Sequence, residues 1–478
     1  MAERSVAISI VVTVEGSKQI RAEFEVEGAG CDEAIQRELK RLGREVVSDA
    51  LVVLDDRLSQ EVPKDWKNVD KEEREVITAL GSVRIRRRVY RDSQRQRHKP
   101  LDEVLGLKKY ERLSEGVKAK GAYLASEVSY RQAAGMLSWM LDEDINHSRI
   151  QEIAWDVGTA LAEEERQQQE AIFKRGAAIE AGKIAARTLY GESDGVHIHL
   201  QRESKRSAEV RVGIMYTGKR AIGVGRRELE NKVCLTALVD DSQEWQEMLL
   251  KTAYANYDLE NTTQLVTGGD GNTWVRYSFA RLEIKQVFQL DRFHLYRAAR
   301  RALGYNRDTN QLVHRCCTLG LEAVEDELRE LLFKAVGTRR EKIGKFANYL
   351  YQNADVLIDY ERRLPEGSEY CCGLGAIEGN VDKLVVHRMK GRGRSWSRTG
   401  ARAMLALCRH KTELQQKAFR LPPLHPDEGR NRSTRRSRTK DADWLQRNVP
   451  VLHSSAEGRP WVQSLKKRIN GRSDLSFI

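Results

Sequence analysis

The sequence has little proline, few cysteines and no long apolar run. Only 8 of its 478 residues are proline, and 40% are hydrophobic against 32% charged. This balance is typical of a folded, charge-rich chain and excludes a largely disordered one. No stretch approaches the roughly 20 consecutive apolar residues that a membrane helix requires. Glu15 interrupts the N-terminal segment before a signal-peptide pattern develops, so we expect a cytoplasmic protein.

The cysteines exclude a disulfide scaffold and argue against a zinc module. There are seven, an odd number, and no pair has CxxC spacing. Two adjacent pairs, 316–317 and 371–372, could in principle bind zinc, but neighbouring side chains diverge, so buried reduced thiols are the better interpretation. No fixed-period repeat is visible, which excludes solenoids and propellers.

Positive charge is what the chain has in excess. Its 82 lysines and arginines exceed its 70 acidic residues, which gives a formal net charge of +12. Such an excess favours a polyanionic partner. The length allows about three domains with sizeable cores.

The N-terminal part predicts a strand, a helix and a basic hairpin. Residues 5–14 alternate apolar and polar side chains, and residues 31–60 have apolar side chains at helical spacing. The segment 77–92 reads as a hairpin around a Gly-Ser turn. One of its faces would carry Arg84, Arg86 and Arg88, which we expect to bind DNA phosphates.

A helix-turn-helix outline follows at residues 129–157. A short helix is predicted from Ser129 to Leu141, then a polar turn, then a helix capped near Asn146. The second helix would present Arg149 and Gln151 to DNA bases. The turn is longer than the usual 3 to 4 residues, so an ordinary helical pair is the competing interpretation. A charged helix over residues 163–186 would connect this region to the next.

From residue 187 the pattern changes to strands in the order βββαβαβ. Hairpin-linked strands followed by alternating helix and strand predict an α/β fold with one mixed sheet and helices on its faces. Residues 294–363 read as helical, residues 373–390 as a further helix, and the region from residue 410 as a basic, irregular tail.

Three acidic residues occupy positions typical of metal ligands. Asp194 lies in the first strand of this sheet, Asp270 follows the fourth strand, and Glu378 lies on the late helix. An RNase H-like nuclease gathers carboxylates in this order to hold two Mg²⁺ ions for phosphodiester cleavage. Each of these residues alone is weak evidence, because Asp-Gly is a common turn dipeptide and a glutamate on a helix is usually solvated. Alternatives for the third ligand are Asp240, Glu361, Glu366 and Asp382.

A helix start after the last strand adds further candidates. Asp291 and His294 are three residues apart, so both could face the site; alternatively, Asp291 merely satisfies a helix-start histidine. On the same helix, Arg297, Arg300 and Arg301 suit phosphate contact. Glycines 268, 269 and 271 around Asp270 would allow a sharp turn and the close approach of a phosphate.

Several dispersed motifs together resemble one family. They are ALGSVRIRRRVYRD, LDEVLGL, ASEVSYRQAAGML, LYGESDGVHIHLQRE, VTGGDGNTWV, VFQLDRFHL and IEGNVDKLVVHRMKGRGRSWSRTGARAML. In this order they resemble the insertion-sequence transposases of the DDE class, most closely the Lre group, long catalogued as an uncharacterised bacterial family. The resemblance extends more distantly to the Mutator-like transposases.

The resemblance implies an activity and a set of site residues. It makes Asp194, Asp270 and Glu378 the triad that holds two Mg²⁺ ions, with Mn²⁺ as a substitute. Asp291 and His294 match a (C/D)xxH motif, and Trp396 with the basic loop residues Lys390, Arg392 and Arg394 matches the end of the pattern. The implied partners are inverted-repeat DNA ends, target DNA and further copies of the chain, as a dimer or larger synaptic assembly in the nucleoid of a bacterium.

The implied domain organisation has six parts. They are an α+β region with the basic hairpin (1–115), a helix-turn-helix-like region with its connector (116–186), the first part of an RNase H-like core (187–293), a helical insertion (294–370), the final core helices (371–410) and a basic tail (411–478). Two alternatives to a strand-cleaving and strand-joining enzyme stay open: a DNA-binding regulator without catalysis, and a nuclease that cuts without joining.

Overall fold

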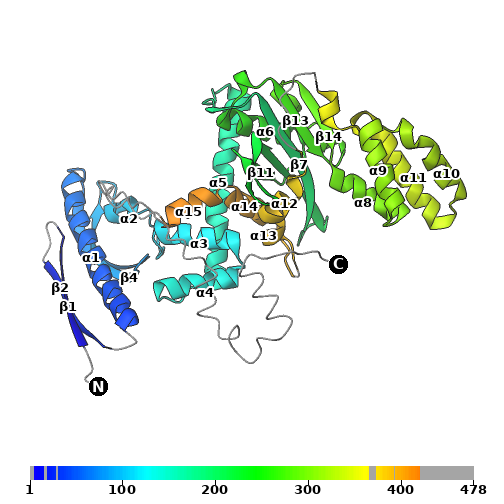
Figure 1. Cartoon of the computed structure of the whole chain (residues 1–478). Coiled ribbons are helices and arrows are strands. Elements are labelled where there is room, and N and C mark those ends of the chain that lie inside the picture. Colours follow the sequence, from blue (N-terminus) through cyan, green and yellow to red (C-terminus); the bar gives the residue numbers. More distant parts are fainter. Residues whose placement is uncertain (1–4, 15–18, 28–30, 365–372, 392, 420–478) are drawn as a thin grey trace, which may run out of the picture. The chain divides into compact units, whose positions relative to one another are not determined.

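The computed structural model describes residues 5–14, 19–27, 31–364, 373–391 and 393–419 (Figure 1). The chain divides into two compact units after Arg420, and the described residues belong to the first. Helices and strands alternate through this unit, and its largest sheet contains both parallel and antiparallel pairs. The mixed α/β class predicted from the sequence is therefore confirmed.

The largest sheet has five strands in the spatial order β11-β8-β7-β13-β14. These strands are β7 (Thr188–His199), β8 (Ser207–Tyr216), β11 (Val233–Ala237), β13 (Gln264–Gly269) and β14 (Gln286–Leu290). The pairs β11–β8 and β8–β7 are antiparallel, whereas β7, β13 and β14 run parallel. Strand β7 is therefore the central strand, between the antiparallel and the parallel part.

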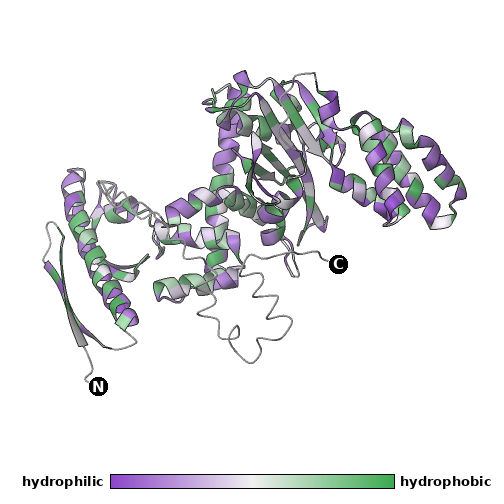
Figure 2. Cartoon of the chain, viewed as in Figure 1, coloured by the Kyte–Doolittle hydropathy of each residue, from purple (hydrophilic) through white to green (hydrophobic). Residues whose placement is uncertain are grey.

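Both faces of the sheet are covered, and neighbouring residues of β7 belong to different cores. Leu189 packs in a cluster with Trp245 and Leu249 of α6 (Ser242–Asn256). Tyr190 packs in the main core, which includes Ile377 of α12 (Ile377–Val381). Side chains on a strand alternate between faces, so the even-numbered residues of β7 face α12. Figure 2 shows green, apolar residues along these central strands.

Some elements differ from their predictions. A hairpin of β9 (Gly218–Gly223) and β10 (Arg226–Glu230) lies between β8 and β11 in sequence and was not predicted. The helix predicted around residues 274–282 is only α7 (Thr273–Arg276) and a 3-10 turn, η3 (Ala280–Leu282). In the hairpin, exposed Arg and Glu side chains replace the apolar alternation that identifies a half-buried strand.

A helical segment follows β14, as the sequence predicts. It contains α8 (Arg292–Leu303), α9 (Arg307–Leu319), α10 (Glu325–Lys334) and α11 (Gly337–Gln352), and ends with the 3-10 turns η5 (Ala354–Val356) and η6 (Tyr360–Arg363). Its core includes Leu295, Val313 and Phe346 and also Leu290 of β14, so the segment packs on the edge of the sheet.

The N-terminal elements form two smaller layers. Helix α1 (Cys31–Glu61) packs against the hairpin of β1 (Ser5–Thr13) and β2 (Gln19–Glu27) and against that of β3 (Lys67–Thr78) and β4 (Gly81–Arg91). The second hairpin begins ten residues before its predicted start. Short elements β5 (Arg97–His98) and α2 (Pro100–Val104) follow it.

The predicted helical pair is present with its caps. Ser129 forms a capping box at the start of α4 (Tyr130–Leu141), and Asn146 caps α5 (His147–Arg175). Helix α5 continues through most of the predicted connector. It packs against α3 (Glu115–Glu127) and α14 (Arg398–Arg409), and α15 (Lys411–Phe419) contacts α3.

The described residues bear on two expectations from composition, namely that no helix spans a membrane and that the cysteines are reduced thiols. Of the helices among the described residues, none is long and apolar enough to span a membrane. Cys31, Cys234, Cys316, Cys317 and Cys408 are free thiols; Cys316 and Cys317 are buried and the other three are partly exposed. Desolvation raises the pKa values of Cys234, Cys316, Cys317 and Cys408. Cys371 and Cys372 lie outside the described residues.

The crossing of α5 and α14 depends on Gly158. A Cβ atom at this position would lie 2.8 Å from the carbonyl carbon of Ala403 and closer still to its oxygen. We expect Gly158→Ala to lower the free energy of unfolding by about 1–3 kcal/mol, because both helices would have to separate. Gly135→Ala on α4 is the control: a Cβ there meets nothing within 4 Å, so it should be neutral or slightly stabilising. Urea denaturation of both variants measures the difference, and equal stabilities would contradict this account of the crossing.

Candidate metal centre

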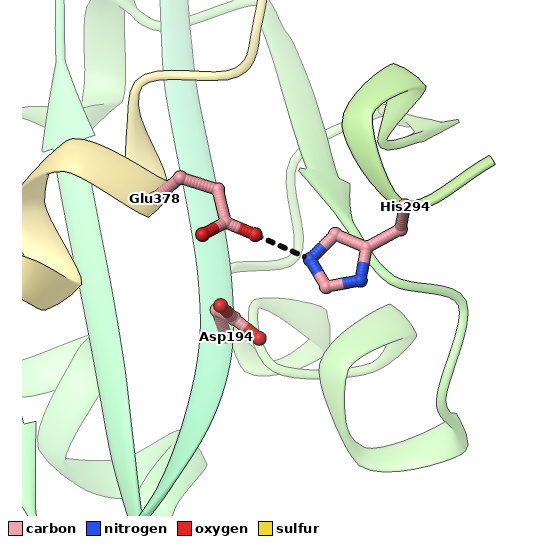
Figure 3. Close-up of side chains that lie close together, drawn as sticks. All are labelled: Asp194, His294 and Glu378. Atoms are coloured by element: carbon pink, nitrogen blue, oxygen red, sulfur yellow. Dashed lines mark ion pairs between the residues drawn. The ribbon is translucent and has the colours of Figure 1, made fainter. Parts of the chain in front are cut away.

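Three side chains from distant parts of the sequence meet beside the central strand (Figure 3). They are Asp194 of β7, His294 of α8 and Glu378 of α12, and their potential ligand atoms all lie within 4.8 Å of one another. Glu378 belongs to a continuous helix from Ile377 to Met389, whose Asp382–Val386 segment, η7, is π-helical. Two of the three predicted triad residues are thus together, and the predicted supporting histidine joins them.

Asp194 is buried and forms no ion pair with a lysine or arginine among the described residues. Its side chain is 8% exposed and accepts a hydrogen bond from the backbone N–H of Gly195 at 2.8 Å. Burial raises the pKa of Asp194 to about 6, and the nearby charges of Glu378 and Asp270 add to this rise. A buried carboxylate in this environment is a ready ligand for a cation.

His294 is oriented from both of its ring nitrogens. Nε2 lies 2.7 Å from Oε1 of Glu378, and Nδ1 lies 3.0 Å from Nη2 of Arg297. A guanidinium can only donate, so Nδ1 accepts and Nε2 carries the proton toward Glu378. Asp291 caps the start of α8 by accepting from the backbone N–H of His294 at 3.1 Å. Asp291 thus positions the histidine through the helix, while the imidazole faces the site.

Asp270 lies just beyond the end of β13, the strand next to β7. Its two carboxylate oxygens accept from the backbone N–H (2.9 Å) and side-chain amide (2.6 Å) of Asn272, and its carbonyl accepts from Tyr349 of α11 at 2.9 Å. Its charge contributes to the raised pKa of Asp194. The charge of Asp270 therefore acts on Asp194. Its carboxylate, however, is bound by Asn272 and is not one of the three clustered side chains.

The glycines near Asp270 have packing and turn roles. Gly271 has a φ of +89°, a left-handed conformation that suits glycine at a sharp turn. A Cβ at Gly269 would lie 2.7 Å from the carbonyl oxygen of Ser193, so this glycine allows β13 to approach β7 closely. Gly268 approaches Leu374. The predicted sharp turn is present at Gly271, Gly269 allows close packing of the two strands, and Gly268 leaves room for Leu374.

Sequence reasoning missed Glu192, which connects the central strand to the helix of Glu378. This carboxylate is 1% exposed and accepts hydrogen bonds from three backbone amides at the start of α12: Gly375 (2.8 Å), Ala376 (3.2 Å) and Ile377 (3.2 Å). The hydroxyl of Tyr216 also donates to it at 2.7 Å. Glu192 and Asp194 are two residues apart and so lie on the same face of β7. Two acids at this spacing in a buried strand are the signal that could have identified it.

The donor chemistry of the site fits a divalent cation. Two carboxylates on a rigid strand and helix, with a third from Asp270 nearby, form an oxygen-rich set that suits Mg²⁺ or Mn²⁺. His294 fits the second shell of such a site, because a ligating carboxylate is commonly oriented by a hydrogen bond. Asp194 and Glu378 are therefore the clustered carboxylates that would hold a cation, and the charge of Asp270 adds to the negative field at Asp194.

A large cationic groove lies beside α12. It has a volume of about 1030 Å³ and runs between the β9–β10 hairpin and the helix of Glu378. Its charged lining residues are Lys219, Arg226, Arg227, Glu228, Lys232 and Lys383. Lys232 donates to the side chain of Asn380 at 3.0 Å, two residues after Glu378. Among the described lining residues five are cationic and one is acidic, so the groove is a positively charged surface next to the metal-site helix that the sequence analysis did not identify.

The arginines predicted to bind DNA from the N-terminal half differ in availability. Arg84 and Arg86 are exposed on β4, whereas Arg88 forms ion pairs with Asp55 (2.7 Å) and Asp56 (2.6 Å). On α5, Arg149 is paired with Glu111 and Glu152, and Gln151 is exposed. Arg88 and Arg149 are thus engaged within the chain, because Asp55, Asp56 and Glu111, which are distant in sequence, fold against them, and Glu152 pairs with Arg149 along the same helix.

The remaining predicted residues lie outside the three-residue cluster. Arg300 stacks on Tyr296 and Tyr305, Arg301 is exposed, and Lys390 is exposed. Arg394 donates to carbonyls of residues 387, 388 and 390, and Trp396 is buried and donates from Nε1 to the carbonyl of Met389 at 2.9 Å. These two residues stabilise the end of the Glu378 helix. Arg392 lies outside the described residues.

None of the alternatives for the third ligand joins the described cluster. Asp240 forms an ion pair with Arg398, and Asp382 is exposed on the helix of Glu378. Glu361 lies in η6, after the helical segment. Glu366 lies outside the described residues. Glu378 is therefore the glutamate that the fold brings to Asp194.

The buried charge of Asp194 should cost stability when no metal is bound. The pKa is about 6 in the folded protein and 3.8 for a free aspartate, so the folded state binds the proton more tightly and gains stability as the pH falls from 7 toward 5. We expect Asp194→Asn to raise the free energy of unfolding at pH 7.5 in EDTA by about 1–2 kcal/mol. The gain should shrink at pH 5. Added Mn²⁺ should raise the Tm of the wild type, less so below pH 6, and not that of the variant. A variant that is less stable in EDTA, or that keeps the full Mn²⁺ response, would refute this role.

Glu192 should control metal affinity without being a ligand. In Glu192→Gln a side-chain amide would face the backbone N–H groups of α12, so we expect a loss of about 1–3 kcal/mol of stability. The Tm increase with Mn²⁺ should also decrease, because Glu378 would no longer be held beside Asp194. Tyr216→Phe is the control, since it removes one donor to Glu192 and leaves the three amide contacts. An unchanged Mn²⁺ response in Glu192→Gln would show that the cap does not position Glu378.

Comparison with known proteins gives the family but no assigned activity. A family model described as "Uncharacterised protein family (UPF0236)" matches residues 28–417. A UPF0236 protein in the vanSb 3' region of Streptococcus gallolyticus is 26% identical over 392 residues, covering 78% of this chain and 81% of the relative. UPF0236 protein TTE2489 of Caldanaerobacter subterraneus subsp. tengcongensis is 23% identical over 375 residues, covering 77% and 75%.

These comparisons correct the family assignment suggested by the sequence motifs. The matching model and the relatives bear only the UPF0236 name, and no transposase family is among the matches. The assignment to the DDE transposases is therefore not supported. Because the model covers most of the sequence, this chain belongs to the uncharacterised protein family UPF0236.

Proposed function

We propose that this chain is a divalent-metal-dependent enzyme that cleaves phosphodiester bonds in DNA and joins the freed 3′-hydroxyl to a second DNA strand. The observation that carries the proposal is the meeting of buried Asp194 with Glu378 and His294 beside the central strand. We further propose that the sheet, with its order of three antiparallel strands followed by two parallel ones, is an RNase H-like catalytic core. The helical segment from α8 to η6 would be its insertion.

The side chains divide the work of the reaction. Bound divalent ions supply activation of the attacking hydroxyl and neutralisation of the leaving oxygen. Asp194 and Glu378 would hold the cations, Asp270 would add negative charge beside them, and His294 would orient Glu378. In joining, the 3′-oxygen forms a bond to a target phosphorus while the target P–O3′ bond breaks and its oxygen takes up a proton. The number of phosphodiester bonds is unchanged, and no covalent protein intermediate is needed.

The cationic groove supports DNA as the substrate. Lys219, Arg226, Arg227, Lys232 and Lys383 line it on both sides, next to the helix of Glu378. Such residues bind backbone phosphates and position a strand without reading its sequence. Exposed Arg84, Arg86 and Gln151 remain predicted contacts to the ends of the DNA, and two DNA ends would require at least two copies of the chain.

The names of relatives are consistent with this function. One relative in Caldanaerobacter subterraneus, 25% identical over 374 residues, has a name that joins eleven locus designations of a single strain. Many copies of one gene in one genome are expected when the product moves its own coding DNA.

Strand cleavage and joining by purified protein test the proposal. The substrates are labelled duplexes of the DNA that flanks the gene, intact or with a free 3′ end, in Mn²⁺ or Mg²⁺. We expect Asp194→Asn, Asp270→Asn and Glu378→Gln each to reduce cleavage at least about 100-fold, since loss of even an outer-shell group costs 10–100-fold. DNA binding in EDTA should persist.

Asp382→Asn is the matched control, because this exposed carboxylate lies on the same helix as Glu378. It should cleave at the wild-type rate. Full cleavage by the Asp194 and Glu378 variants would refute the catalytic assignment. Cleavage without joining of a free 3′ end would instead identify a nuclease, and selective binding without either reaction would identify a DNA-binding regulator.

A further inference from the structure

A second cavity, of about 250 Å³, lies where α4, α5 and α14 meet the end of β7. Its lining includes Tyr130, Trp155, Gln201, Arg388, Arg394 and Trp396, and we call it the Arg388 pocket. It shares no lining residue with the cationic groove or with the cluster of Asp194, His294 and Glu378. Its chemistry therefore needs a separate explanation.

Arg388 is a buried cation with an unsatisfied donor. The residue is 4% exposed, and its guanidinium lies over the rings of Tyr130 (5.0 Å) and Trp396 (5.1 Å), both of which line the pocket. Nε donates to the carbonyl of Ala125 at 2.5 Å, and the Tyr130 side chain also interacts with the guanidinium, but Nη2 makes no hydrogen bond among the residues that the structure describes. Burial lowers its pKa. A buried guanidinium with a free donor is costly unless an acceptor completes it.

The rest of the pocket is also arranged for an anion. Arg394 provides a second positive charge, and the part of the lining that the structure describes contains no aspartate or glutamate. Two helices of twelve residues begin at the pocket: α4, capped by Ser129, and α14, capped by Ser397. Helix N-termini carry partial positive charge and backbone N–H groups without partners in the helix, which favour anions.

The position of the pocket relates it to the metal site. The backbone N–H of Trp396 donates to the carbonyl of His199, at the end of β7, at 3.0 Å. His199 is five residues from Asp194, which corresponds to about 17 Å along a strand. B-form DNA rises about 3.4 Å per step, so this separation equals about five base-pair steps. One DNA duplex could reach both places.

We propose that the Arg388 pocket binds a phosphate group, and that its source is a backbone phosphate of DNA about five nucleotides from the bond positioned at Asp194. This inference rests on the proposed function. Arg388 and Arg394 would supply the charge and the helix N-termini the amide donors. Trp155, partly exposed at the rim, provides an aromatic surface for the adjoining sugar or base. A free phosphate ion could use the same chemistry, and the test separates these two sources.

The test places a negative charge in the pocket without removing a buried side chain. Gln201→Glu changes one exposed lining residue almost isosterically, and Ser395→Asp has Ser395→Asn as its neutral control. Binding of a labelled 30-base-pair duplex is measured by fluorescence anisotropy in EDTA over a range of KCl concentrations. We expect both acidic variants to bind about fivefold to tenfold more weakly, with the slope of log K against log salt reduced by about one, as for one lost phosphate contact. Ser395→Asn should bind like the wild type.

Thermal unfolding with inorganic phosphate, at constant ionic strength, distinguishes the free ion. If phosphate raises the Tm of the wild type, the acidic variants abolish that rise and DNA affinity is unchanged, the pocket takes a free phosphate and the DNA assignment is overturned. Unchanged DNA affinity with no phosphate effect overturns the proposal altogether.

The outcome can be separated from that of the proposed catalysis, because binding is measured without metal. Weaker binding by the acidic variants supports the pocket even if the wild type does not cleave DNA. Normal binding by these variants refutes the pocket even if the wild type cleaves.

Discussion

A carboxylate enclosed in the main core holds this site together. Glu192 satisfies three backbone amides at the start of α12 and the hydroxyl of Tyr216, and it is almost completely shielded from water. In this environment each hydrogen bond matters, because an unpaired donor or acceptor would bear the full cost of desolvation. The contact therefore fixes α12 on the central strand, and Glu378 is thereby placed beside Asp194 despite being 184 residues distant in the chain.

The two buried acids of the central strand differ in how many hydrogen bonds they accept. This difference distinguishes Glu192, which supports the fold, from Asp194, which is the candidate ligand. Glu192 has donors for both of its oxygens, whereas Asp194 has only a neighbouring N–H among the described residues and a pKa raised to about 6. Acidic side chains that burial and like charges make costly are typical of functional sites, where a ligand offsets the cost. Arg388 is the positively charged counterpart, because it is a buried cation whose Nη2 makes no hydrogen bond among the described residues.

Positive charge on this chain is partly internal and partly available. Arg88 and Arg149 are paired with acidic residues within the chain. The cationic groove and the Arg388 pocket, in contrast, have few or no acidic residues in their linings. The net charge of +12 can attract a polyanion only where the positive side chains are concentrated. A surface on which acidic residues neutralise them gives little attraction.

Local patterns in the sequence determined much of the secondary structure. The strands β7, β8, β11, β13 and β14 were predicted in order, as were the caps at Ser129 and Asn146 and the helical segment after β14. Alternation and helical spacing depend on neighbours in sequence, so they can be read without the fold. Asp194, Glu378 and His294 were also candidates, because the order of strand, strand end and late helix and the resemblance to a family pointed to them jointly.

Only the tertiary structure decided which residues meet. The sequence could not show that Glu192 ties down α12, that Asn272 holds Asp270, or that Asp55 and Glu111 neutralise the predicted DNA-binding arginines. It also could not show that the unpredicted β9–β10 hairpin faces α12 across a cationic groove, or that Arg388 is enclosed by two aromatic rings. Except for the contacts of Asn272 with Asp270 and of Trp396 with Arg388, each of these contacts joins segments far apart in the chain, and their energies depend on burial, which exists only after the chain has folded.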